Sequence, residues 1–171
     1  MKTSFAATGE QLATALKALD VNFITGSNSG KQTPPMKPGQ LLATLAQSSE
    51  SRLRLSLIPL FLEHPEFAIY ARTVAKALDP TARLLFQCYY TAAVWLQRQY
   101  RARLDVLIGK KPSLPDYFSR ELDLDIGSDP ELNLRSLAKR HQDLSGAPLN
   151  WLGTYQHAVQ VWIKGLEIQR A

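Results

Sequence analysis

The densest group of side chains able to hold an anion lies at residues 98–111. This stretch carries five cations against a single carboxylate, Asp105, which gives it a local net charge of +4. Arginine and lysine bind phosphate groups, and a tyrosine ring or an arginine plane can stack on an exposed base. We therefore define this stretch as the basic face, a candidate nucleic-acid-binding surface made of Arg98, Tyr100, Arg101, Arg103, Lys110 and Lys111.

Two features of the sequence bear on the basic face. Arg98 and Arg101 are three residues apart, so one continuous helix would place them on a shared face. An acidic stretch follows at residues 116–131, with six carboxylates against Arg120 alone and a local net charge of −5. Opposite charges so close along the chain favour partial internal neutralisation over phosphate binding.

A second arrangement with chemical potential joins Arg135 to His141. Five residues separate the two side chains. This spacing resembles the loose arginine-to-histidine pattern of HEPN ribonucleases, and Ser136 matches the polar residue that usually follows the arginine in that family. The resemblance implies a helical ribonuclease that works without a metal at a dimer cleft. The alternative interpretation is a solvated helical face.

The remaining reactive side chains predict neither a metal site nor an enzyme. His64 lies between Glu63 and Glu66, but Pro65 separates them by a helix break and no second histidine cluster joins them. Cys88 sits among apolar residues, which is typical of a buried small hydrophobe. The sequence has no phosphate-binding glycine loop and no nucleophile elbow. We expect no cofactor.

One long helix at residues 79–111 would position most of these side chains. Asp79 and Pro80 have the sequence of a helix cap followed by a first-turn proline, and no Gly or Pro interrupts the stretch until Gly109. Residues 84–96 are apolar on nearly every face of such a helix, so other elements must surround it. The sequence predicts an all-α, single-domain helical bundle around this central helix.

The spacing of apolar residues and the helix caps also predict the elements that would surround the central helix. Pro59 should kink or break the helix expected at residues 50–64, because proline lacks a backbone donor. The stripe of Trp151, Tyr155, Ala158 and Trp162 on the last helix predicts core packing. The expected helices are residues 40–47, 50–64, 66–78, 116–122, 130–144 and 149–169.

A short helix precedes this body. Thr8 and Gln11 have the spacing of a capping box, and Leu12, Leu16 and Leu19 recur at helical spacing behind them. Residues 25–39 are rich in Gly, Ser, Asn and Pro, which is typical of a flexible linker. We therefore divide the chain into an N-terminal arm (1–24), a linker (25–39) and a body (40–171), and expect the three leucines to bind a partner.

Composition limits the class of protein. The chain has 171 residues, a net charge of +5, a pI near 9.4 and one cysteine. A lone cysteine cannot form an intrachain disulfide, and the N-terminus lacks the apolar run of a signal peptide. The longest uncharged run, residues 84–97, is too short to span a bilayer. We expect a cytoplasmic protein without a membrane partner.

Three stretches together resemble one known group of proteins. They are residues 51–68 (SRLRLSLIPLFLEHPEFA), 88–97 (CYYTAAVWLQ) and 114–122 (LPDYFSREL). They look like a family of small uncharacterised bacterial all-helical proteins, some of which are encoded beside stand-alone nucleotidyltransferases. The resemblance covers about residues 40–171. It implies a non-enzymatic partner protein and carries no functional residue over.

The sequence therefore supports three functional hypotheses. The first is a non-enzymatic helical interaction or regulatory subunit that binds a protein partner or a second copy of itself. The second is a nucleic-acid-binding protein that uses the basic face. The third is a HEPN-like ribonuclease that uses Arg135 and His141.

Overall fold

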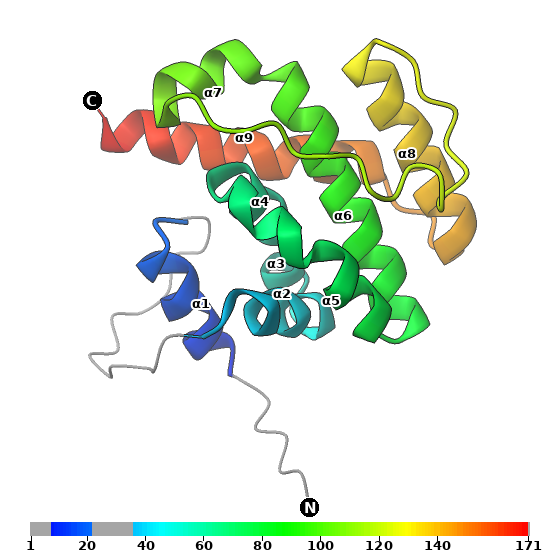
Figure 1. Ribbon diagram of the computed structural model, residues 1–171, viewed down its shortest axis with the longest axis horizontal. Coiled ribbons are helices and arrows are strands. Elements are labelled where there is room, and N and C mark those ends of the chain that lie inside the picture. Colours follow the sequence, from blue (N-terminus) through cyan, green and yellow to red (C-terminus); the bar gives the residue numbers. More distant parts are fainter. Residues whose placement is uncertain (1–7, 22–35, 171) are drawn as a thin grey trace, which may run out of the picture.

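The computed structural model of the protein describes residues 8–21 and 36–170, and every regular element within them is a helix. Figure 1 shows the helix of residues Pro80–Gln99, α6, running through the middle of the molecule with other helices around it. The predicted all-α fold is confirmed.

From α2 to α7 the elements follow one another with short connections. None of the described helices is long and apolar enough to cross a bilayer. In chain order the elements are α1 (Gly9–Ala18), α2 (Pro38–Gln47), α3 (Ser51–Leu55), α4 (Leu57–Glu63), the 3-10 helix η1 (Pro65–Tyr70), α5 (Ala71–Ala77), α6 (Pro80–Gln99), α7 (Arg101–Ile108), α8 (Pro130–Ser145) and α9 (Trp151–Gln169).

α6 begins as its sequence predicts and is buried along its middle. The Asp79 side chain accepts a hydrogen bond from the backbone N–H of Ala82, and Pro80 occupies the first turn. Every residue from 86 to 97 is buried, and Cys88, Tyr89 and Val94 are 0%, 4% and 0% exposed. Helices α4, α8 and α9 pack against it. A helix that is apolar on all sides thus lies inside the bundle.

The prediction that this helix continues without interruption to Lys111 is wrong. The chain turns at Tyr100, whose φ of −102° and ψ of 15° lie outside the helical range, and α7 leaves in a new direction (Figure 1). No Gly or Pro marks this turn. It brings Leu104 and Leu107 of α7 into the core, where both are buried. Burial of these two side chains favours the turn over a straight continuation into solvent.

The break expected from Pro59 is confirmed. The helix predicted at residues 50–64 is divided into α3 and α4, which meet at Ser56. Proline has no backbone N–H, and its ring crowds the carbonyl four residues earlier, which here belongs to Leu55, the last residue of α3. The hydroxyl of Ser56 donates a hydrogen bond to the Leu53 carbonyl at the junction.

Two other predicted helices take a different form. Residues 66–78 divide into the 3-10 helix η1, which starts at Pro65, and α5. Residues 116–122 form a turn and no regular helix. In that turn the Asp116 carboxylate accepts a bond from the Ser119 N–H, and Asp123 has a φ of 57°. A non-glycine residue in this left-handed region ends helical geometry, so the segment stops after one turn.

The last two helices agree with their sequence signals. The Asp129 side chain caps α8 through the N–H of Glu131, and Gly146 ends it with a left-handed φ of 68°. The stripe of Trp151, Tyr155, Ala158 and Trp162 on α9 is buried, as predicted for a core face. These helices close the bundle behind and beside α6 (Figure 1).

Native Cys88 is expected to react very slowly with a water-soluble disulfide reagent. Its side chain is buried, and burial raises the pKa of the thiol from 9.0 to about 12, so little nucleophilic thiolate exists at neutral pH. The release of the chromophore from an aromatic disulfide, followed by absorbance, should be rapid in denaturant and slow in buffer. Rapid release from the native protein would mean that α6 is exposed.

Candidate functional site

The N-terminal arm lies against the body of its own chain. The capping box between Thr8 and Gln11 is formed, and it starts α1 where the sequence predicts. Leu12 and Leu16 are 2% and 1% exposed, and Val21 just beyond the helix is 1% exposed. Helix α1 contacts α2 and α3. Two of the leucines expected to bind a partner are therefore covered by this chain, and Leu19 is partly buried against the same core.

The boundary between the linker and the body differs from the sequence prediction. Residues 25–35 of the predicted linker lie outside the described residues. Helix α2 begins at Pro38, two residues before the predicted start of the body.

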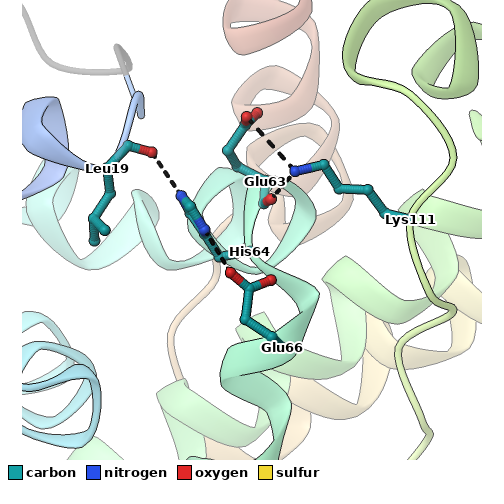
Figure 2. Close-up of polar contacts among 5 residues, drawn as sticks. All are labelled: Leu19, Glu63, His64, Glu66 and Lys111. Atoms are coloured by element: carbon teal, nitrogen blue, oxygen red, sulfur yellow. Dashed lines mark hydrogen bonds and ion pairs between the residues drawn. The ribbon is translucent and has the colours of Figure 1, made fainter.

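Both ends of α1 are seated by specific contacts. At its start, a Cβ on Gly9 would lie 2.5 Å from a carboxylate oxygen of Glu50 and 3.5 Å from a methyl of Leu53, so the backbone of α1 approaches α3 directly. At its end, Nε2 of His64 lies 2.6 Å from the carbonyl oxygen of Leu19 (Figure 2). Carbonyls at a helix C-terminus lack partners within the helix, and His64 supplies one. We call the seat between Glu50, Leu53 and His64 the arm groove.

His64 connects the arm to a second polar contact. Its Nδ1 lies 2.8 Å from a carboxylate oxygen of Glu66, and its ring stacks on Phe67 with centroids 5.2 Å apart. Figure 2 shows the ring between Leu19 and Glu66. Burial alone would raise the pKa of Glu66, but the hydrogen bond and charge of His64 outweigh it and lower the pKa. Both ring nitrogens of His64 are thus used, one toward the Leu19 carbonyl and the other toward the Glu66 carboxylate.

Lys111 holds the segment after α7 to the end of α4. Its Nζ donates a hydrogen bond to the backbone carbonyl of Glu63 and lies 3.8 Å from a carboxylate oxygen of the same residue (Figure 2). The other carboxylate oxygen of Glu63 is buried without a hydrogen-bond partner. Burial raises the pKa of Glu63, and the charge of Lys111 opposes that shift. Lys111, predicted to contact phosphate, is thus engaged within the chain.

Arg101 and Arg103, two other cations of the basic face, are also bonded within the chain, whereas Arg98 stacks on a ring. The guanidinium of Arg98 lies over the Trp95 ring at 4.5 Å. Arg101 donates to the Lys111 carbonyl at 2.9 Å and to the Ser113 hydroxyl, and Arg103 donates to Glu167. Tyr100 occupies the turn between α6 and α7, so Arg98 and Arg101 do not lie on one continuous helix as expected, while Lys110 is exposed. Arg101, Arg103 and Lys111 are therefore bonded within the chain, whereas Arg98 is stacked on a ring and Lys110 is exposed.

The acidic stretch does not supply the carboxylates that pair with the basic face. In the described chain those carboxylates are Glu63, Asp105 and Glu167. Within the acidic stretch, Glu131 pairs with Arg135 and Glu121 accepts a hydrogen bond from Gln87. Neutralisation therefore involves acids that are distant in sequence, with Asp105 as the exception.

Arg135 and His141 lie in different environments. Arg135 is exposed and pairs with Glu131 at 3.1 Å. His141 is 2% exposed, its Nδ1 lies 2.6 Å from the Tyr155 hydroxyl, and its ring stacks on Trp151 at 3.6 Å. Burial lowers the pKa of His141 from 6.5 to about 4. The histidine is a core residue in this structure, and this position does not favour the ribonuclease hypothesis.

Sequence patterns did not indicate a third group, the cations beside the turn at residues 118–123. Arg72, Lys76 and Arg83 line a cleft there. Arg72 and Lys76 lie one turn apart on α5, but no local spacing links them to Arg83, which lies on α6 beyond the connection at Asp79. Among the described residues, no group of three or more His, Cys, Asp or Glu side chains is placed to hold a metal ion.

Comparisons with protein families, with curated proteins and with solved structures found no match. The resemblance to small bacterial helical proteins therefore stays a prediction, and the function has to be argued from the contacts within this chain.

Proposed function

We propose that this protein is a non-enzymatic interaction subunit that receives an amphipathic helix of a protein partner in the arm groove. The observation that carries the proposal is the seat of α1, with Leu12, Leu16 and Val21 buried on the body. Recognition of a helix in a groove depends on apolar side chains at such spacing. On this proposal α1 is the resident occupant, and a partner helix with the same pattern replaces it.

The size of the seated helix supports exchange. Each fully buried leucine or valine contributes about 1.5–3 kcal/mol, and ordering the backbone and side chains offsets much of that gain. A helix as short as α1, which has ten residues, is only marginally stable by itself in water, so its contacts in the groove must hold it. An arm held by a few side chains can be displaced by a partner that binds the same groove more strongly.

The contacts at the two ends of α1 define the chemistry of the partner. Close approach to Glu50 and Leu53 requires a small residue at the start of the incoming helix, as Gly9 provides. The carbonyl that accepts from His64 requires a helix that ends in the groove. We place this interaction in the cytoplasm, because a lone cysteine suits a reducing compartment.

A labelled peptide of residues 8–21 tests whether the groove accepts a helix in trans. We expect it to bind full-length protein carrying Leu12→Asp and Leu16→Asp at least about tenfold more tightly than it binds the wild type. The two changes remove the resident arm, and apparent affinity scales with the fraction of molecules whose groove is vacant. Fluorescence anisotropy measures both dissociation constants.

The control peptide carries the same two aspartates and should bind neither protein. Far-UV circular dichroism and thermal unfolding establish that the variant keeps its folded body. Failure of the wild-type peptide to bind the folded variant would contradict the proposal. Concentration-dependent dimerisation of the wild type, lost in the variant, would show instead that a second copy occupies the groove.

A further inference from the structure

A cleft with a volume of about 290 Å³ opens on a part of the molecule distinct from the arm groove. The last turns of α5, the first turns of α6 and the turn at residues 118–123 form its walls. The segment that contains this turn crosses α6 after leaving α7 (Figure 1). None of the residues that seat α1 lines the cleft.

Arg83 is a fixed positive charge in the wall of the cleft. Its guanidinium donates hydrogen bonds to the carbonyls of Ala75 at 2.8 Å, Lys76 at 3.1 Å and Leu78 at 3.0 Å. These are carbonyls at the C-terminal end of α5, which otherwise lack partners. Arg83 therefore has a structural role, and its charge is partly offset by the helix end.

Arg72 and Lys76 are one turn apart on α5 and project into the same cleft. The guanidinium of Arg72 lies 4.3 Å from the centroid of the Tyr117 ring, which orients its plane. Within the described residues, neither side chain forms an ion pair with a carboxylate. An arginine held by stacking keeps its planar fork of donors available to an anion.

The opposite wall is mostly neutral or apolar. Phe118 is 2% exposed and contributes the edge of an apolar surface. Glu121 is the single carboxylate in the lining, and it accepts a hydrogen bond from Gln87 at 2.9 Å. Three cations against one carboxylate leave the lining with a net charge of +2, part of which the end of α5 offsets.

From this arrangement we infer that the cleft binds a small organic phosphate, with the phosphate between Arg72 and Lys76 and the organic part toward Phe118. A phosphate monoester carries about −1.5 to −2 charges at neutral pH, which matches the excess charge of the lining. The volume lies near the lower end for ligand pockets, about 300 Å³, and so excludes a large ligand. This site is independent of the proposed helix-binding function.

Isothermal titration of the full-length protein with phenyl phosphate at low salt tests the inference. We expect saturable binding at one site. Arg72→Gln and Lys76→Gln should each weaken it about ten- to a hundredfold, the usual loss for one charge-assisted hydrogen bond. Lys139→Gln, which removes the same charge from an exposed position on α8, should bind as the wild type does. Arg72 and Lys76 are exposed, so these variants should keep the wild-type thermal midpoint.

Further titrations show which part of the ligand is responsible for binding. Inorganic phosphate should bind more weakly than phenyl phosphate because it lacks a group to contact Phe118, and benzyl alcohol should not bind. Sulfate should compete with phenyl phosphate for the wild-type protein, a measurement that needs no variant. The inference is overturned if binding does not saturate, if all three variants lose affinity equally, or if inorganic phosphate binds as tightly as phenyl phosphate.

Discussion

Replacement of Phe61 by alanine is expected to lower the free energy of unfolding by about 3–5 kcal/mol, the usual range for a buried phenylalanine. Phe61 is 0% exposed and lies where α4 meets α6. Its ring packs edge-on against Tyr90, with centroids 4.8 Å apart, and against Phe86 at 6.0 Å. Removing the ring loses these contacts and leaves a cavity beside the central helix.

Urea unfolding followed by far-UV circular dichroism measures this effect. Since small domains are stable by only about 5–15 kcal/mol, the alanine variant should unfold at much lower urea. Phe61→Leu keeps most of the volume and should cost about 1 kcal/mol. Val106→Ala, at a side chain that is 78% exposed, should change stability by less than about 0.5 kcal/mol. Equal effects at Phe61 and Val106 would contradict the packing of α4 on α6.

Acidification is expected to destabilise the protein through His141. Burial lowers the pKa of this histidine from 6.5 to about 4, so between these values the unfolded chain binds a proton that the folded protein does not. The contribution of His141 to stability is therefore greatest above pH 6.5 and decreases as the pH falls toward 4. The full difference is about 3 kcal/mol, at about 1.4 kcal/mol for each unit of pKa.

Chemical unfolding at a series of pH values measures the slope. His141→Gln should flatten the profile between pH 6.5 and 4, even if the variant is less stable throughout. His157→Gln is the matched control for the loss of a histidine as such, because His157 lies exposed on the same helix as Tyr155. A profile that keeps its slope without His141 would show that this side chain is not the buried titrating group.

We propose two separate places for recognition on this molecule, the arm groove and the cleft. The arm groove is occupied by the apolar side of α1, whereas one wall of the cleft carries Arg72 and Lys76, which form no ion pair with a carboxylate in the described chain. On the basic face, by contrast, Arg101, Arg103 and Lys111 bond to carboxylates or backbone carbonyls of the same chain. This difference is why we assign recognition to the first two places.

Local sequence predicted the beginnings and ends of helices well. Asp79-Pro80 and Asp129-Pro130 begin α6 and α8, and Gly146 ends α8. These signals act through hydrogen bonds within one turn of the chain, so they need no knowledge of distant residues. The break near Pro59 is local too, because proline lacks the backbone N–H that a continuous helix needs. In contrast, no local signal marks the turn at Tyr100, because this turn depends on the packing of Leu104 and Leu107 into the core.

Sequence alone determined that residues 84–96 must be surrounded, because a helix that is apolar on nearly every face is stable only inside a protein. Tertiary structure decided everything that depends on residues far apart in the chain. It placed His141 in the core, seated Leu12 and Leu16 on their own body, and paired Arg103 with Glu167. It also brought Arg72 and Lys76 beside Phe118. Spacing along a helix specifies which side chains share a face, but the partner of that face is selected by packing and charge across the whole fold.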